Sequence, residues 1–322
     1  MKSVFVTGGS GFVGRALIPR LLERGLTVRA LTRSERAAQT VQALGATPVQ
    51  GDLLNTDALR QGMTGCDTVF HLAASVDFFA DAQTLWPEHV TGTEYVLKAA
   101  QLNQVRRFVY LSASSVIMNG RPVFNADETA VSDHLIDGYS QTKLAAETRV
   151  LAASSPTFST VAIRPPLIWG KGDTSALPQL MEAAQKGQLA FIGGGTHEFV
   201  TANVQNVCEA LLLAADSSVS GETFFVTDGE RLIFKDFIKA MLATQGIHVP
   251  DRSVPLPVAR AIAYVLAGAW RLLRLKGQPP LYPGAVNSLG LPFILNDRKI
   301  RQRLHYRPVL SVAEGLRQMQ RS

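Results

Sequence analysis

The stretch VFVTGGSGFVGRALIPRLL, residues 4–22, reads as a short apolar strand, a glycine-rich turn and the start of a helix. Small residues there allow a tight turn and let a pyrophosphate approach the helix N-terminus, where free N–H groups and the helix dipole meet its charge. A glycine fingerprint alone is a weak signal, but its place between a strand and a helix gives it a mechanism. The stretch therefore predicts a dinucleotide site that includes Gly8, Gly11, Phe12, Val13 and Gly14.

Short apolar runs alternate with helical patterns over the first two-thirds of the chain. The expected strands cover 3–7, 27–32, 47–50, 67–73, 106–112 and 159–164, and the segments between them include helical patterns at 12–24, 92–103 and 140–153. Alternation of this kind is typical of an α/β fold with a doubly wound parallel sheet of the Rossmann type.

The pattern loosens after Ile168, where Pro and Gly become frequent. Helices are expected near 174–187, 204–215 and 234–244, and a short strand at 223–228. We expect a dinucleotide-binding domain over 1–168, with 198–217 returning to it, and a smaller, interleaved α/β substrate region over 169–322.

Composition narrows the class of protein. The chain has 322 residues, of which 46% are hydrophobic, and a net charge of +6. A basic balance suits an anionic ligand or membrane surface, whereas no Lys/Arg run with interleaved aromatics favours nucleic acid. The two cysteines, Cys66 and Cys208, are far apart, and no residue spacing suggests a metal site. With no signal peptide in view, a reducing, cytoplasmic location is expected.

The segment 254–276 contains an uninterrupted apolar run from Ala261 to Trp270. These ten residues are too few to span a bilayer, which needs about 20. Two interpretations stay open, namely a helix that covers an apolar pocket or the core, and an interfacial membrane helix with basic ends. The flanking basic residues are Arg260, Arg271, Arg274 and Lys276.

The end of the second strand bears on cofactor preference. An NAD-preferring site places a carboxylate there for the ribose hydroxyls, but this chain has Thr32 followed by Arg33. A guanidinium suits a 2′-phosphate, so we expect NADP(H), with NAD(H) still possible. Asp52, in the "GDLLN" that follows the third strand, either accepts hydrogen bonds from the adenine edge or caps the helix beginning near Thr56.

Tyr139 and Lys143 are four residues apart in "GYSQTKLAAE" (138–147) and lie on one face of a helix. A nearby ammonium favours the phenolate, so the pKa of the Tyr139 phenol is expected to fall. A hydride-transfer enzyme needs such an acid/base to move the proton of a carbonyl or alcohol.

These motifs together resemble the extended short-chain dehydrogenase/reductases of the NAD-dependent epimerase/dehydratase superfamily. The resemblance covers nearly the whole chain through TGGSGFVG (7–14), GDL (51–53), HLAA (71–74), YSQTK (139–143), RPPLIWG (164–170) and RQRLHYRPVLSVAEGL (301–316). It implies a sheet of about seven strands, with Tyr139 as the acid/base and Lys143 on the nicotinamide ribose. It also implies a cofactor lining that includes Leu53, Leu72, Ala73, Ala74, Pro166 and Ile168.

Two positions depart from the family pattern. A Ser or Thr usually stands three residues before the Val that follows the fifth strand, but here Val116 is preceded by Ala113 at that place. Neighbouring Ser112 or Ser114 is expected to supply the hydroxyl that polarises the substrate oxygen. His89 stands where an Asn is common, either as a helix-packing residue or as a substitute polar contact, and His71 reads as a structural histidine.

The segment after the sixth strand indicates the substrate. Leu167 occupies a position where sugar-nucleotide enzymes of the family often carry an amide, and its side chain makes no hydrogen bond. This favours an apolar substrate and the subgroup similar to 3β-hydroxysteroid dehydrogenases.

The function expected is an NADP(H)-dependent oxidoreductase acting on a ketone or secondary alcohol of a steroid-like or acyl-derived substrate. Two alternatives stay open, a sugar or nucleotide-sugar epimerase or dehydratase with tightly bound NAD, and a non-catalytic dinucleotide-sensing protein. The resemblance also implies a homodimer paired through the helices at 92–103 and 140–153.

Overall fold

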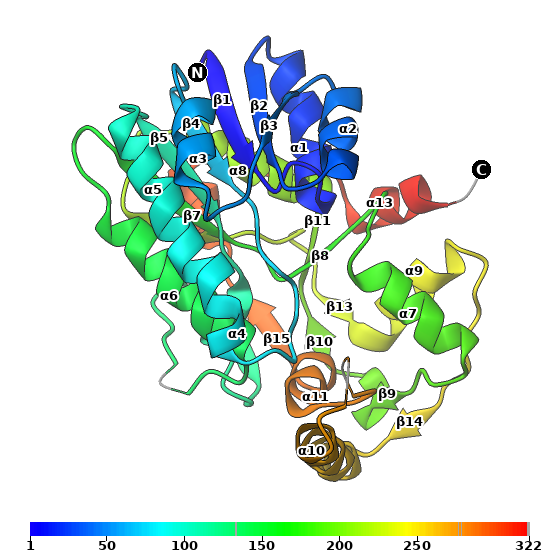
Figure 1. Cartoon of the computed structure of the whole chain (residues 1–322). Coiled ribbons are helices and arrows are strands. Elements are labelled where there is room, and N and C mark those ends of the chain that lie inside the picture. The colour runs from blue at the N-terminus through cyan, green and yellow to red at the C-terminus, as the bar shows by residue number, and fades with distance from the viewer. Residues whose placement is uncertain (133, 276, 278, 321–322) are drawn as a thin grey trace.

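The computed structural model describes residues 1–132, 134–275, 277 and 279–320. Its centre is a seven-stranded parallel sheet in the order β12-β7-β5-β4-β1-β2-β3 (Figure 1). The expected doubly wound α/β sheet of about seven strands is therefore confirmed. The strands are β1 (Ser3–Thr7), β2 (Thr27–Thr32), β3 (Thr47–Gln50), β4 (Thr68–His71), β5 (Arg107–Leu111), β7 (Ser159–Arg164) and β12 (Glu222–Phe225).

Helices cover both faces of this sheet. One apolar cluster joins the sheet to α1 (Phe12–Glu23), α2 (Glu35–Ala43) and α8 (Val204–Asp216). A second cluster joins its other face to α3 (Thr56–Gly62), α5 (Gly92–Leu102) and α6 (Gly138–Ala152). Because both faces are covered, the central strands β4 and β5 are buried along their whole length.

The helix before α5 contains a local irregularity. α4 (Ala82–Trp86) continues into a π-helical turn at Pro87–Thr91 and then directly into α5. Pro87 has no N–H to donate to the helical ladder, which accounts for the break at this point. His89 lies in this turn and is buried.

The remaining segments form a smaller lobe beside the sheet (Figure 1). A four-stranded sheet in the order β13-β10-β15-β6 combines β6 (Val123–Ala126), β10 (Glu198–Phe199), β13 (Leu232–Ile233) and β15 (Phe293–Leu295). Two further sheets have two strands each. One pairs β8 (Leu167–Trp169) with β11 (Thr201–Asn203), and the other pairs β9 (Phe191–Ile192) with β14 (Ser253–Val254). The helices of this lobe are α7 (Ala176–Gln185), α9 (Phe234–Ala243), α10 (Leu256–Leu272), α11 (Pro283–Gly290) and α13 (Val312–Met319). α12 (Arg298–Arg303) instead packs on the main sheet through Ile300. Short 3₁₀ turns occupy Ser114–Ile117 and Gly193–Gly195.

Two segments differ from the boundaries expected. The strand expected at 223–228 is β12, which pairs with β7 and completes the main sheet, so the return to that sheet extends beyond 198–217. The helix expected within 254–276 is α10, which ends at Leu272 and is followed by Leu273 as its C-cap. Lys276 lies outside the described residues.

Candidate functional site

The glycine turn lies at the centre of the sheet, where the chain order reverses between β1 and β4. Gly8 has a φ of +70°, and a Cβ there would lie 2.8 Å from the backbone nitrogen of Ala73. A Cβ on Gly14 would lie 2.3 Å from the carbonyl oxygen of Gly8. Glycine is therefore required at both positions, by backbone conformation and by close approach. Ligands of open α/β sheets bind at such a reversal, beyond the carboxyl ends of the strands.

The N-terminus of α1 fits an anionic group. Gly11 caps this helix, and among the described residues no side chain accepts its first N–H groups or places a carboxylate in its first turn. Phe12 and Val13 are the first two residues of the helix. Free amides and a positive helix end suit a dinucleotide pyrophosphate, so the residues present fit the group that the sequence predicts.

The segment after β4 runs beside this turn. The Ala73 amide donates to the Thr7 hydroxyl at 3.2 Å, which places the predicted lining residues Leu72, Ala73 and Ala74 next to Gly8. His71 is buried and shares hydrogen bonds with the Thr7 and Thr93 hydroxyls at 2.7 and 2.9 Å. Burial, and next the charge of Lys143, lowers the pKa of His71 to about 3. It is thus a neutral histidine held between β1 and α5.

The ends of β2 and β3 carry the predicted adenosine contacts. Arg33 follows β2 and is exposed, whereas the Thr32 hydroxyl donates to the Val49 carbonyl within the sheet. Asp52 is exposed and accepts from the Leu54 amide at 2.9 Å. The alternative role of Asp52 as the cap of α3 is wrong, because the Asn55 side chain accepts from the Ala58 amide and caps that helix.

The three other predicted lining residues differ in how far they are buried. They are Leu53, Pro166 and Ile168. Leu53 is buried and packs closely on α5. A Cβ added to Gly92 of that helix would lie only 2.8 Å from the Leu53 Cβ. Ile168 lies in β8 opposite Ala202 and packs against the apolar cluster that contains α1 and α8. Pro166 is partly exposed and follows Pro165, whose carbonyl accepts from the Ser114 amide at 2.9 Å.

Tyr139 lies in the first turn of α6, which Asp137 caps through the Ser140 amide. Its ring packs against Phe78 at 4.7 Å between centroids and forms a buried apolar cluster with Leu85 and Ala113. The hydroxyl makes no hydrogen bond within the described part of the chain. Burial, and next the charge of Asp137, raises the pKa of Tyr139. The expected fall in this pKa is therefore not what the structure shows.

The ammonium of Lys143 contacts β5. Its Nζ donates to the Leu111 carbonyl at 2.7 Å and lies 4.2 Å from the centroid of the Tyr110 ring. Burial lowers the pKa of Lys143 to about 7. The side chain is held by the backbone and a ring face, not by a partner at the Tyr139 hydroxyl.

The serines after β5 lie beside Tyr139. Ser112 and Ser114 are buried, and Ala113 between them contacts Tyr139. The Ser112 hydroxyl is buried without a partner among the described residues, and so is that of Ser115. Ser115 is not among the predicted residues, because the family pattern points to the place of Ala113 and its direct neighbours. An unpaired buried hydroxyl is costly, and these two are therefore candidates for contact with a ligand.

His89 connects α6 to the loop after β4. Its Nε2 accepts from the Ser75 amide at 3.0 Å, and its Nδ1 lies 2.8 Å from the Thr142 hydroxyl. Its ring meets that of Tyr139 edge-on at 5.6 Å. Burial, and next the Lys143 charge, lowers the pKa of His89 to about 4. His89 therefore combines the two interpretations, since it packs between helices and also makes a polar contact.

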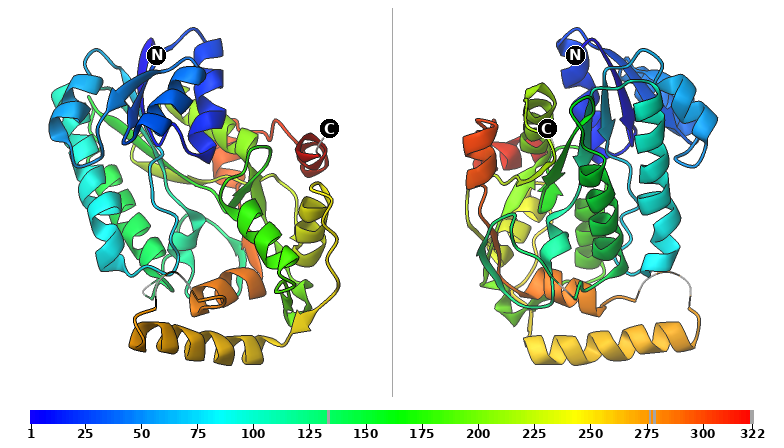
Figure 2. Two further views of the ribbon diagram at one scale, coloured as in Figure 1. Left: turned by 45° about the vertical axis from the view of Figure 1, so that its right-hand side comes forward. Right: turned by 90° about the vertical axis from the view of Figure 1, so that its left-hand side faces the viewer.

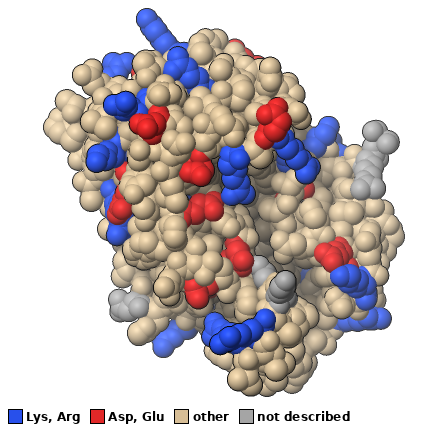
Figure 3. All heavy atoms as spheres, viewed as in Figure 1, with Lys and Arg blue, Asp and Glu red and all other residues tan. Residues whose placement is uncertain are grey.

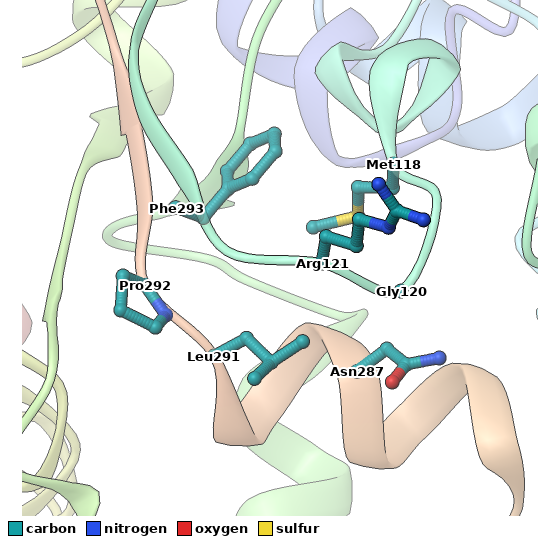
Figure 4. A pocket seen from close by; sticks show the side chains of 7 residues that line it. All are labelled: Met118, Gly120, Arg121, Asn287, Leu291, Pro292 and Phe293. Atoms are coloured by element: carbon teal, nitrogen blue, oxygen red, sulfur yellow. The ribbon is translucent and has the colours of Figure 1, made fainter. Parts of the chain in front are cut away.

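A small cavity lies between α11, the chain that leads into β15 and the chain after Ser114–Ile117 (Figure 4). Met118, Leu291, Pro292 and Phe293 give it apolar walls, and Arg121 and Asn287 add polar groups. None of the predicted site residues lines it. On the face shown in Figure 3, the surface is also hollowed between the sheet and the smaller lobe.

Comparisons with known proteins identify the family of this chain. The model of the 3-beta hydroxysteroid dehydrogenase/isomerase family matches residues 5–258. A 4-hydroxy-2-methyl-3-oxo-4-farnesyl-3,4-dihydroquinoline-1-oxide ketoreductase of Stigmatella aurantiaca is 42% identical over 97% of this chain and 94% of its own. A 2-alkyl-3-oxoalkanoate reductase of Stenotrophomonas maltophilia is 34% identical over 99% of this chain and 98% of its own.

The solved structure of a UDP-glucose 4-epimerase from Thermotoga maritima superposes with a TM-score of 0.77, at 19% identity, over 98% of this chain and 97% of its own. This likeness shows the fold alone. The matches to the family model and to the two reductases show the family as well as the fold. Membership of this family implies a nicotinamide dinucleotide as cofactor. The chain belongs to the 3-beta hydroxysteroid dehydrogenase/isomerase family and is an enzyme of the extended short-chain dehydrogenase/reductase type.

Proposed function

We propose that this enzyme uses NADP(H) to reduce a ketone, or to oxidise the corresponding secondary alcohol, in an apolar substrate. The observation that carries the proposal is the placement of Tyr139. Its hydroxyl is unpaired among the described residues, its ring is set in apolar side chains, and it contacts Ala113, which follows the carboxyl end of β5.

The reaction needs a hydride, a proton and a group that polarises the carbonyl. The nicotinamide supplies or accepts the hydride when it is bound. Tyr139 donates the proton to the substrate oxygen, and burial keeps its phenol protonated until that step. Ser112 or Ser114 donates a hydrogen bond to the same oxygen, with Ser115 available from the same turn. Lys143, with a pKa near 7, supports the cofactor ribose and the proton balance around Tyr139.

The preference for NADP(H) rests on Arg33. This exposed guanidinium follows β2 directly, at the place where a carboxylate would bind the ribose hydroxyls of NAD. A planar fork of donors is matched to a 2′-phosphate.

The apolar substrate is supported by two observations. Leu167 is partly buried in β8 and offers no side-chain hydrogen bond to a sugar diphosphate. The Stigmatella aurantiaca relative acts, by its name, on a compound with a farnesyl group, and a 31% identical relative from Dictyostelium discoideum is a sterol-4-alpha-carboxylate 3-dehydrogenase.

Turnover with NADPH and with NADH across steroids, 2-alkyl-3-oxo acids and prenylated ketones tests the proposal. We expect activity with NADPH and one of these apolar classes, and a loss of about 10²- to 10⁴-fold in Tyr139→Phe. Tyr95→Phe, on α5, is the matched control and should keep full activity. Arg33→Ala should weaken NADPH binding by about 10- to 100-fold with little effect on NADH. The proposal fails if the purified protein retains NAD(H) through gel filtration and converts a UDP- or dTDP-sugar instead.

A further inference from the structure

The helix α10 presents its larger apolar side chains to solvent. Its inner face packs on the protein through Ala259, Ala263 and Ala267, which are all buried. Its outer face exposes Val258, Ile262, Tyr264, Val265 and Leu272, of which Val265 is 70% and Leu272 83% exposed. A surface helix of a globular protein normally has the reverse arrangement, with an apolar stripe on the core and polar residues outside.

The position of α10 leaves this outer face open. In both views of Figure 2 the helix runs along the outermost edge of the molecule, at the end away from β1. α11 lies behind it, and Val286 of α11 joins Ala259 and Ala263 in one buried cluster. The 17-residue helix is thus attached along its inner face, and only its outer face can meet a partner.

The charges around α10 are mainly basic and favour one kind of partner, although the Asp81 carboxylate interacts with Arg271. The sequence contains no Asp or Glu from Arg252 to Asn296. Arg271 and Arg274 are exposed at the C-terminal end of the helix, and Arg260 reaches the Gly120 carbonyl at 3.3 Å. Figure 3 shows an uncharged surface at this lower end of the molecule, with basic side chains at its margin. An apolar face with basic flanks complements anionic lipids, whereas a second copy of it would bring like charges together.

We propose that α10 lies flat on an anionic membrane surface. Ile262 and Val265 enter the boundary between headgroups and acyl chains, and Arg271 and Arg274 contact lipid phosphates. Tyr264, which is 67% exposed, sits at the headgroup level with its hydroxyl toward water.

Aromatic contacts connect this end of the molecule with the candidate site. Tyr282, the N-cap of α11, contacts Phe79 at 5.6 Å between ring centroids, and neighbouring Phe78 contacts Tyr139 at 4.7 Å. Any use of these side chains by a substrate rests on the proposed function, whereas the docking of α10 does not.

Flotation with phosphatidylcholine vesicles, with and without phosphatidylglycerol, tests the docking. The full chain should float with the anionic vesicles, less so as salt is added. Ile262→Ser combined with Val265→Ser should lower vesicle binding at least about tenfold. Arg271→Gln combined with Arg274→Gln should remove most of the difference between the two lipid compositions. Leu102→Ser, at the exposed end of α5, is the matched control and should bind as the wild type does.

Three results would overturn the proposal. One is equal binding by the α10 serine variant and the wild type, and another is an equal loss in Leu102→Ser. The third is a concentration-dependent dimer in sedimentation that the α10 serine variant abolishes, because the face would then bind a second copy. Turnover of a water-soluble ketone should be unchanged in the α10 variant, so a failure of docking is distinguishable from a failure of the proposed function.

Discussion

The sheet and α10 use apolar side chains in opposite ways. In β1, Val4, Phe5 and Val6 are fully buried between two layers of helices. In α10, Val265 is 70% exposed while the alanines of the same helix are buried. Apolar area stabilises the fold only where it is removed from water, at about 25 cal/mol per Å². Changes in the sheet layers should therefore alter stability, and truncation of the exposed apolar side chains of α10 should alter mainly binding.

The largest effect that follows concerns the buried ion pair between α6 and β7. Arg164 Nε donates to Glu147 Oε2 at 2.9 Å, and both side chains are almost wholly buried. Glu147→Gln leaves the guanidinium charge buried without its counter-charge, so the free energy of unfolding should fall by about 3–5 kcal/mol. Urea denaturation of both proteins measures this change in the free energy of unfolding.

Glu94 provides the matched control on the same outer layer of helices. It pairs with Arg149 of α6, and both side chains are more than a third exposed. Glu94→Gln should cost less than about 1 kcal/mol. Equal effects of the two substitutions would contradict the contrast between buried and exposed groups.

Two glycine substitutions should change stability in opposite directions. Gly14→Ala forces a Cβ to within 2.3 Å of the Gly8 carbonyl oxygen, which should cost about 3 kcal/mol and abolish NADPH binding. Gly268, inside α10, has open space around its Cβ position, so Gly268→Ala should raise the free energy of unfolding by about 0.5–1 kcal/mol. Thermal unfolding with NADPH titration measures both, and a gain in Gly14→Ala would refute the close packing of the turn.

Another predicted effect depends on pH and involves His89. Burial keeps this side chain neutral, with a folded-state pKa of about 4 instead of 6.5. The unfolded chain therefore binds more protons between these values, and stability falls as pH drops through this window, by about 2 kcal/mol at about pH 5. His89→Asn should make the decline in unfolding free energy less steep. His248→Asn, at an exposed position, should leave the slope unchanged, and an unchanged slope in His89→Asn would exclude this role.

The local sequence was enough to predict the strands of the main sheet and the glycine-rich turn after β1. Strands of the main sheet are short Val- and Phe-rich runs. The turn after β1 needs a positive φ at position 8, and glycine is the residue type that adopts it readily. The pair Tyr139 and Lys143 was visible because helical spacing alone places i and i+4 on one face.

Long-range packing decided what the sequence left open. β12 was expected as a strand but not as the seventh member of the main sheet, because strand pairing depends on residues about 60 positions away in β7. The Tyr139 phenol was expected to be acidified, yet its burial, and next the charge of Asp137, raise its pKa.

By itself, the sequence determined the fold class, the dinucleotide turn and the family, because these depend on local geometry and residue order. Only the tertiary structure decided that His89 joins α6 to the loop after β4, which hydroxyls are left unpaired near Tyr139, and which face of α10 meets solvent. These features depend on burial, and burial is a property of the assembled chain and not of any segment.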